Sequence, residues 1–409
     1  MRVNKNVKHS SEFVAALKII KFPKQVFTRL LKMKPQTFLK LIYIAIPTLI
    51  FSVLSIAQVQ AEEKIKIASI YAFSGVAAQP NEISIRGVRH GVQEVNSRGG
   101  VLGKKIELIE FDNKSTPIGS KVAADMAVKA DVSAIIGAAY SSHTLAIAKV
   151  AQANNIPMIT NVSTNTNITR IGEYIFRVCY SDQFQGEVMG AFCREELKVS
   201  TVVIFVDITS DYSMELSNEF QRNFEKRGGK TLAKLNYKQS QRSYRHLVLQ
   251  AKKMNPDALF IPGYDESALI VKEAFNAGIK AIPLGGDGWD NKTFFNKGGA
   301  ALKRGYYCTH WAEEVGNKIS RRYIKKYKKN EQIYASEVLA YDAVLLLAEA
   351  INRAGSTDRE KIRDALAKTR GFKGVTGTIT FNDKRDPIKN AVIMKIKDGR
   401  EYYFKSYRP

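Results

Sequence analysis

The chain has 409 residues, of which 45% are hydrophobic and 25% are charged, and its formal net charge is +24. These values exclude a disordered or fibrous chain and leave enough length for two globular domains. The basic residues are spread along the whole chain and match no nucleic-acid-binding motif. We therefore predict no nucleic-acid partner, and a charge that favours solubility and attraction to anionic surfaces.

Residues 1–61 have the features of an export signal peptide with a long basic N-terminal region. The apolar run 41–56 follows this region, and the small residue Ala61 predicts cleavage directly after it. The basic region is longer than in ordinary signal peptides, so Met33 is a candidate for the true start. The alternative is an uncleaved inner-membrane anchor, although Pro47 interrupts the run and the run is short for a spanning helix.

After Lys64 the sequence alternates between short apolar runs typical of buried strands and longer segments typical of helices. Strands are predicted at 65–71, 106–112, 134–136, 157–160, 174–178, 202–206, 232–237, 258–261, 282–285 and 306–309. Helices are predicted at 82–97, 117–129, 144–153, 184–197, 214–226, 244–254, 266–277 and 335–354. This alternation predicts an α/β fold with parallel sheets that helices cover on both faces. The series is too long for one sheet, so we predict two doubly wound parallel-sheet lobes that meet near residues 180–182.

The last third of the chain carries three further predictions. The apolar helix 335–354 is expected in a core, and the basic run 321–329 has the spacing of a solvated helix face. Segments 374–383 and 391–396 are expected to form the last two strands.

Two predicted strands end in turns rich in serine and threonine. Ser141 and Ser142 follow the strand 134–136, and residues 161–164 follow the strand 157–160. Neighbouring parallel strands bring such turns to one edge of the sheet, where hydroxyls and free helix N–H groups bind anions. The turns therefore predict a carboxylate site, and the alternative is that Ser141 and Ser163 only cap helices.

Three later turns also follow strands and carry aromatic or acidic residues. Tyr212, Tyr264, Asp287 and Trp289 lie in these turns. They would give a second lobe aromatic walls and a carboxylate that faces the serine- and threonine-rich turns. An anion site opposite an acid suits a zwitterion.

The sequence contains no motif for a cofactor, a metal or a catalytic nucleophile. The glycine-rich segment 99–104 has neither the spacing nor the Ser/Thr of a phosphate-binding loop, and neither a nucleophile elbow nor a zinc-protease motif occurs. Three cysteines without metal spacing and five scattered histidines predict no metal site. We therefore predict no cofactor and no enzyme, and leave a Cys179–Cys193 disulfide open.

From Lys64 to about residue 400 the chain resembles type I periplasmic binding proteins, in particular the leucine/isoleucine/valine-binding branch of ABC importers. The resemblance rests on the order and spacing of several segments together: 67–75, 95–103, 136–142, 156–160, 174–177, 263–264, 286–288 and 341–343. It implies a periplasmic substrate-binding protein, a monomer, whose partners are a small solute and an importer permease.

The resemblance also implies two lobes joined by a three-strand hinge and a ligand site between them. Residues 64–181 and 311–380 would form lobe 1, and residues 182–310 and 381–409 would form lobe 2. Ser141 and Thr164, with main-chain groups of Ala139 and Val162, would bind the α-carboxylate of an amino acid. Asp287 would bind its α-ammonium group, and Tyr212 and Tyr264 would cover it from lobe 2.

The chain departs from the family pattern at several positions. Pro80 stands near the place of an aromatic residue, and Asp287 is shorter than the family's glutamate. Tyr140 replaces a disulfide cysteine, and Lys114 and Ser115 fill the partner region. The preferred ligand side chain stays open between a branched-chain amino acid and an amide, urea-like or aromatic solute.

Two other functions remain as alternatives. A sensory module of the same fold would pass ligand information to a partner receptor or regulator. A hydrolase would use Ser141 as nucleophile, with His143 as the only nearby base.

Overall fold

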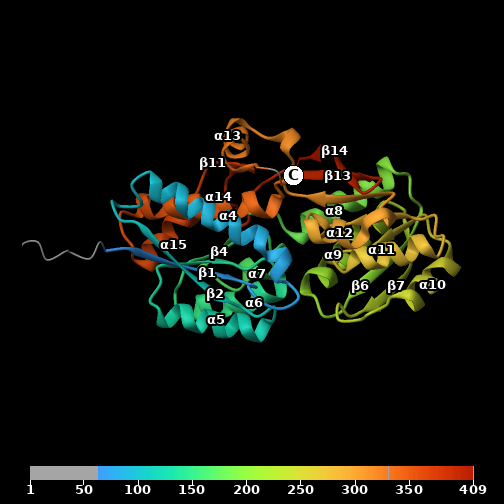
Figure 1. The fold of residues 1–409 in the computed structure, drawn as a ribbon, viewed down its shortest axis with the longest axis horizontal. Coiled ribbons are helices and arrows are strands. Elements are labelled where there is room, and N and C mark those ends of the chain that lie inside the picture. The colour runs from blue at the N-terminus through green and yellow to red at the C-terminus, as the bar shows by residue number, and fades with distance from the viewer. Residues whose placement is uncertain (1–62, 330, 409) are drawn as a thin grey trace, which may run out of the picture. The chain divides into compact units, whose positions relative to one another are not determined.

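The structure is a computed structural model that describes residues 63–329 and 331–408 (Figure 1). The predicted signal peptide, its cleavage after Ala61 and the possible start at Met33 lie outside these residues.

One half of the described chain, called lobe 1 below, is built on a five-stranded parallel sheet with the order β2-β1-β3-β4-β5. Its strands are β1 (Ile65–Tyr71), β2 (Ile106–Asp112), β3 (Ala134–Gly137), β4 (Met158–Thr160) and β5 (Ile175–Arg177). Its helices are α4 (Ala78–Ser97), α5 (Pro117–Lys129), α6 (Ser141–Ala153) and α7 (Asn167–Arg170). Later segments add α13 (Lys318–Tyr327), α14 (Ala335–Ala354), α15 (Arg359–Ala367) and the hairpin β11 (Phe372–Gly374) with β12 (Gly377–Ile379).

Strand β1 shows why both faces of this sheet are covered. Ile67 and Tyr71 pack with α4 and α14 on one face, whereas Ala68 and Ile70 pack with α5 and α6 on the other. Alternate residues of a strand point to opposite faces, so a largely apolar strand such as β1, in which only Lys66 is exposed, is buried on both. The helix predicted at 335–354 is confirmed as a core element with the same bounds.

The other half, called lobe 2, is built on a seven-stranded sheet with the order β14-β13-β10-β9-β8-β6-β7. Its strands are β6 (Thr201–Asp207), β7 (Lys230–Tyr237), β8 (Ala258–Phe260), β9 (Ile282–Gly285), β10 (Arg304–Thr309), β13 (Ala391–Lys397) and β14 (Arg400–Tyr407). Its helices are α8 (Asp182–Ala191), α9 (Asp211–Lys226), α10 (Arg245–Met254), α11 (Ser267–Asn276) and α12 (Lys292–Gly298). Short helical turns are η1 (Phe192–Glu196), η2 (Asp287–Trp289), η3 (Gly299–Ala301) and, beyond β10, η4 (Glu313–Val315).

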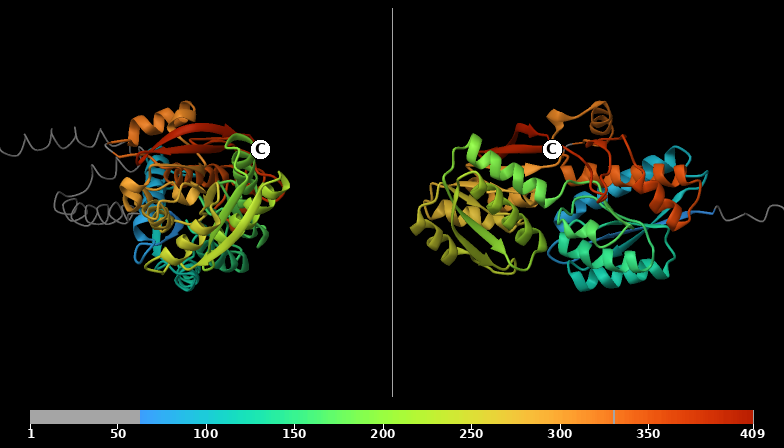
Figure 2. Two further views of the ribbon diagram at one scale, coloured as in Figure 1. Left: turned by 90° about the vertical axis from the view of Figure 1, so that its right-hand side faces the viewer. Right: turned by 180° about the vertical axis from the view of Figure 1, so that it is seen from behind.

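The chain passes between the two sheets three times, after β5, after β10 and after β12 (Figure 2). The sequence predicted two α/β lobes joined by three connections. The structure confirms this fold class. The turns that follow β3, β4, β8 and β9 lie at the carboxyl ends of parallel strands, where open α/β sheets bind their ligands.

The C-terminal strands differ from the prediction. The segment expected as one strand at 374–383 contains a tight hairpin, β11–β12, with Gly377 at φ +111°. The strand β14 was not predicted, because its residues are largely exposed and lack a clean apolar alternation. Strands β13 and β14 are antiparallel additions to the edge of the parallel sheet, so the sheet of lobe 2 is mixed.

A disulfide between Cys179 and Cys193 does not form, because both thiols are free. Cys179 is buried in the core of lobe 1, whereas Cys193 lies in η1 and is buried in the core of lobe 2. The two side chains therefore belong to different cores.

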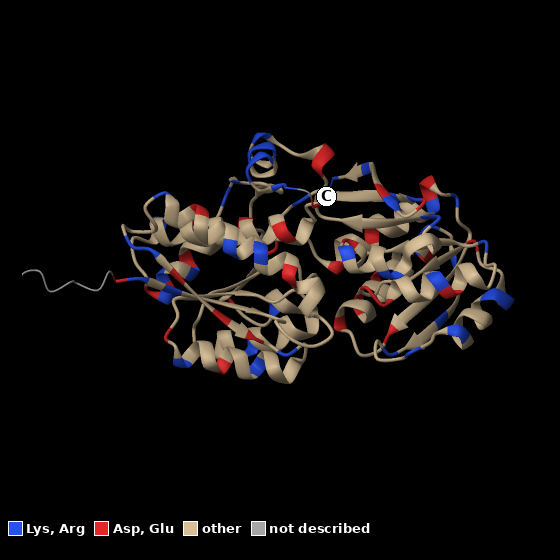
Figure 3. Cartoon of the chain, viewed as in Figure 1, with Lys and Arg blue, Asp and Glu red and all other residues tan. Residues whose placement is uncertain are grey.

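The basic run 321–329 is confirmed as a solvated helix face. It occupies most of α13, where Arg321, Arg322 and Lys325 are exposed while Tyr323 packs against α14. Figure 3 shows this helix as a basic feature, with other basic residues distributed over both lobes.

Candidate functional site

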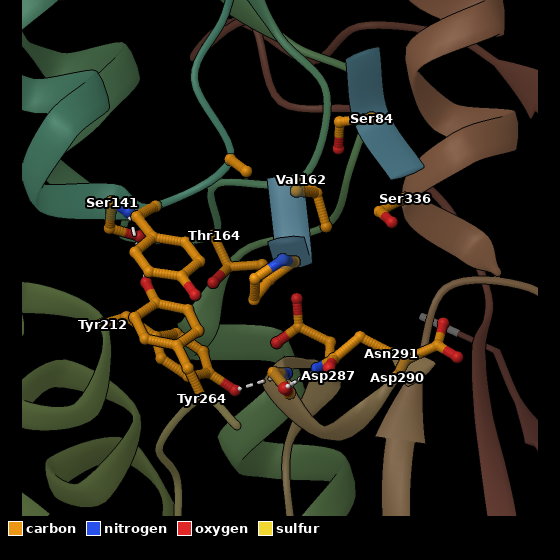
Figure 4. Close-up of a pocket in the computed structure, with 14 residues that line it drawn as sticks. Ser84, Ser141, Val162, Thr164, Tyr212, Tyr264, Asp287, Asp290, Asn291 and Ser336 are labelled. Atoms are coloured by element: carbon orange, nitrogen blue, oxygen red, sulfur yellow. Dashed lines mark hydrogen bonds between the residues drawn. The ribbon is translucent and has the colours of Figure 1, made fainter. Parts of the chain in front are cut away.

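Turns from both lobes enclose one cavity, which Figure 4 shows at close range. Its volume of about 50 Å³ is room for a few water-sized molecules, which suits a small solute. It is lined by all seven residues predicted from the sequence: Ala139, Ser141, Val162, Thr164, Tyr212, Tyr264 and Asp287. Residues that were not predicted also line it: Pro80, Ser84, Tyr140, Gly288, Asp290, Asn291 and Ser336.

Ser141 lies at the start of helix α6 and faces the cavity. Helix α6 begins three residues earlier than predicted, so Tyr140 holds the N-cap position and makes no side-chain cap bond. Ser163 also caps no helix, because its hydroxyl contacts Thr144 Oγ1 at 2.6 Å and the carbonyl of Ala138 at 3.0 Å. The alternative that Ser141 and Ser163 only cap helices is therefore wrong. The early start places the N–H of Ser141 in the first helical turn, where it has no partner within the helix and makes only a long bond of 3.4 Å to the Tyr264 hydroxyl.

The turn that carries Thr164 is held from behind by Arg177, the last residue of β5. Arg177 is fully buried and donates to the carbonyls of Thr164 and Asn165, both at 2.8 Å. Its Nε lies 2.7 Å from the Asp386 carboxylate, which balances the buried charge. Because its backbone carbonyl is fixed from behind, Thr164 is free to present its hydroxyl to the cavity.

Asp287 comes from the turn after β9 in lobe 2, and its side chain is 6% exposed. Gln185 donates to its carboxylate at 2.8 Å and accepts from its backbone N–H at 2.9 Å, while His310 Nε2 lies 3.1 Å from the carboxylate. Burial lowers the pKa of His310 although the bond to Asp287 opposes the shift, so the imidazole is neutral at pH 7 and donates from Nε2. Within the described residues, no lysine or arginine forms an ion pair with Asp287.

Three tyrosine rings form one wall of the cavity. Tyr140 of lobe 1 stacks on Tyr264 of lobe 2 with ring centroids 3.7 Å apart and planes 4° apart. Tyr212 lies 5.1 Å from Tyr264, and its hydroxyl accepts from the N–H of Gly288 at 3.1 Å. In the sequence, Tyr140 stood out only because it replaces a disulfide cysteine of the family. In the structure its ring is the aromatic surface of lobe 1 that contacts lobe 2.

The opposite end of the cavity is polar, and the sequence did not predict it. Ser84 and Ser336 come from α4 and α14, two helices whose apolar residues indicate only a core. Asp290 accepts from Thr309 Oγ1 at 2.6 Å and from the N–H of Ala335 at 3.1 Å. Burial raises the pKa of Asp290, and nearby Asp287 adds to the rise. The sequence held one indication of Asp290: it lies three residues after Asp287, in the turn that follows the same strand.

The pairing that a hydrolase would need is not present in the part of the chain that the structure describes. Ser141 Oγ accepts from the N–H of Asn165 at 3.4 Å, and His143 contacts Asn113 instead of Ser141. Burial lowers the pKa of His143 to about 4, so it is a weak base.

Residues 63–329 and 331–408 contain no group of histidine, cysteine or acidic side chains arranged to hold a metal ion. No helix among them has the length and apolarity needed to cross a bilayer.

The sequence matches the family described as periplasmic binding protein over residues 64–401. It is 28% identical over 334 residues to the leucine-, isoleucine-, valine-, threonine- and alanine-binding protein of Pseudomonas aeruginosa, which covers 81% of this chain and 88% of that protein.

Two solved structures share the fold. A leucine-binding protein from Thermotoga maritima is 34% identical, with a TM-score of 0.82 over 84% of this chain and 99% of that one. The branched-chain amino acid transporter substrate-binding protein of Streptococcus pneumoniae, in complex with isoleucine, is 29% identical, with a TM-score of 0.79 over 85% of this chain and 100% of that one.

Proposed function

The chain belongs to the periplasmic binding protein family, and on that premise we propose that it binds an amino acid or a related small polar solute between its lobes and delivers it to an ABC importer. The relatives are named for binding amino acids, and the Streptococcus pneumoniae relative is a substrate-binding protein of a transporter.

The observation that carries this proposal is the division of the cavity between the two lobes. Hydroxyls and N–H groups at Ser141 and Thr164 come from lobe 1, and the Asp287 carboxylate comes from lobe 2. The first set suits the carboxylate of an amino acid, and Asp287 suits its ammonium group. Main-chain groups of Ala139 and Val162 would add to the carboxylate site, and Tyr212 and Tyr264 would cover the solute.

A solute held in this way contacts both lobes and so stabilises the closed arrangement, which is how a ligand shifts a conformational equilibrium. We propose that the two lobes move as two rigid bodies. They are divided as the sequence predicts, except that residues 381–390 move with lobe 1, where Phe381 packs in the core and Asp386 pairs with Arg177. The importer permease would recognise the closed protein.

The proposed location is the periplasm. The family is named for that compartment, and residues 1–61 have the sequence of an export signal. A mature monomer after cleavage near Ala61 is part of the proposal.

A thermal-shift screen of the purified protein tests the function, because a ligand that binds only the folded state raises the melting temperature. The screen covers the common amino acids, their amides, urea and small aromatic acids, and calorimetry then measures each hit. We expect at least one amino acid to bind with a stoichiometry of one, and the Thr164→Val variant to bind it more weakly. If no amino acid or amide stabilises the protein, the proposed function is wrong.

A further inference from the structure

The cavity has two ends with different chemistry. Figure 4 shows Ser141 and Thr164 toward one end, Asp287 between, and Ser84, Ser336 and Asp290 toward the other. A solute whose carboxylate and ammonium group occupy the first end and the centre directs its side chain toward Ser84 and Asp290.

Asp290 lies at that end, and it also lines a second hollow together with Thr309 and Glu401. Its Oδ2 accepts both the Thr309 and the Ala335 bonds, and no group in the described part of the chain bonds to Oδ1. Ser84 Oγ accepts from Asn161 Nδ2 at 3.0 Å, which leaves its hydroxyl proton free to donate.

Asn291 does not share this role, because its side chain is already used. Its Oδ1 accepts from the N–H of Phe294 at the start of α12, and its Nδ2 donates to the carbonyl of Gly288, both at 2.9 Å. Asp290 is therefore the acceptor that this end of the cavity offers a solute.

The charge of the residues that line the cavity also favours a solute with a hydrogen-bond donor. Asp287 and Asp290 are both acidic, and the lining contains no lysine, arginine or histidine. A leucine or isoleucine side chain would cover Asp290 Oδ1 without giving it a partner, and an unpaired buried acceptor is costly. Burial raises the pKa of Asp290. A hydroxyl or ammonium group on the solute would supply the missing donor, and an ammonium group would also favour the charged form of this carboxylate.

We propose that the solute is an α-amino acid whose short side chain ends in a hydrogen-bond donor, and that Asp290 receives this donor. The proposal rests on the proposed function, because it assumes that the α-carboxylate and α-ammonium groups bind at Ser141 and Asp287. Pro80 and Val162 line the middle of the cavity and would contact the carbon atoms of the side chain. A cavity volume of about 50 Å³ suits a short side chain.

Calorimetry with two matched ligand pairs tests this proposal. Threonine and valine have the same shape but differ by a hydroxyl group, and 2,3-diaminopropionate and 2-aminobutyrate differ by an ammonium group. We expect the donor-bearing member of at least one pair to bind at least about tenfold more tightly, because a site built for a donor rejects the analogue that lacks it. The pair that responds tells whether the donor is a hydroxyl or an ammonium group.

The Asp290→Asn variant separates the recognition of the solute's side chain from a general effect on closure of the lobes. This residue also bonds to Ala335, so the variant can weaken closure with every ligand, but that effect leaves the ratio within a pair unchanged. We expect the ratio for the diaminopropionate pair to fall by at least about tenfold, because the variant removes the negative charge. The Asp125→Asn variant on α5 removes one acid outside the cavity and should leave every ratio unchanged.

Each other outcome has one meaning. Tight binding of leucine, isoleucine or valine with no preference for either donor would overturn this proposal and leave the proposed function standing. An unchanged diaminopropionate ratio in Asp290→Asn, or an unchanged threonine ratio in Asp290→Leu, which has no acceptor, would remove Asp290 from the role. Absence of binding by any amino acid would overturn the proposed function and this proposal with it.

Discussion

Asp287 is the residue on which the predicted amino-acid site depends most. Gln185 and His310 each place an N–H against its carboxylate, and both are uncharged donors, so its negative charge is left for the solute. The proposed site would thus be arranged in advance to bind a cation.

Replacing Asp287 by Asn keeps the shape of the side chain and removes its charge. We expect binding of the solute to weaken by about 2–5 kcal/mol, because the buried ammonium group then lacks its partner. Calorimetry gives the dissociation constants, with Asp125→Asn as the control that loses one exposed acid of an ion pair with Lys121. An Asp287→Asn protein that binds as tightly as the wild type would exclude Asp287 from the site.

At this scale the sequence predicted those site residues that stand directly after strands. Ser141, Thr164 and Asp287 follow β3, β4 and β9, and polar residues at strand ends are visible in the sequence. Ser84 and Ser336 escaped prediction because they lie singly within α4 and α14, the first buried and the second half-buried, where a small serine is typical of close helix packing. These serines line the cavity only because lobe 2, which is distant in the sequence, closes the cavity from the other side.

At the scale of elements, the turn after β4 takes its shape from one buried side chain. Arg177 donates to successive carbonyls of that turn and pairs with Asp386. The sequence identified Arg177 only through the family resemblance, because contacts with a loop more than ten residues away leave no local pattern.

The Arg177→Met variant should lose several hydrogen bonds and leave Asp386 unpaired. We expect the free energy of unfolding to fall by about 3–5 kcal/mol, the usual cost of breaking a buried ion pair. Urea denaturation measures the change. Arg177→Lys keeps the charge but lacks the planar fork, so it should recover only part of the loss. A loss below about 1 kcal/mol in Arg177→Met would contradict this account.

The turn before α11 contains a buried acid that should make stability depend on pH. Glu266 accepts from the Tyr237 hydroxyl at 2.8 Å and from the N–H of Tyr264 at 3.1 Å, and burial raises its pKa to about 7. The pKa in the folded state is raised above its unfolded value, so the folded protein holds the proton longer. This contribution to stability is complete below about pH 4.5 and is lost as the pH rises through about 7.

The Glu266→Gln variant carries an uncharged amide at all pH values. Between about pH 5 and pH 8 the wild type should lose on the order of 2–3 kcal/mol of unfolding free energy relative to this variant. Urea denaturation of both proteins across that range gives the difference. Parallel stability curves would show that Glu266 does not hold its proton in the folded state.

At the scale of the whole described unit, contacts between the lobes frame the cavity. The N–H of Asp211 donates to Ser142 Oγ at 3.1 Å, and the N–H of Thr166 donates to Glu215 at 2.9 Å. The Tyr140–Tyr264 stack lies beside these bonds. The alternation of strands and helices predicted the two lobes, but the sequence could not predict which tyrosines would meet, because that depends on the angle at which the lobes close.

The Tyr264→Ala variant should weaken binding of the solute by about 1–3 kcal/mol, since it removes the stack and part of the cavity wall. Tyr264→Phe keeps the ring and loses only the long bond from the N–H of Ser141 at 3.4 Å, so it should bind nearly as well as the wild type. Calorimetry compares the two. Equal losses in both variants would assign the effect to the hydroxyl and contradict a role for stacking.

A crystal structure with the bound solute tests the proposed binding mode. We expect one amino acid between the lobes, with its carboxylate within hydrogen-bond distance of Ser141 and Thr164 and its ammonium group against Asp287. A solute bound outside this cavity, or bound inside it with the carboxylate turned toward Asp287, would contradict the account.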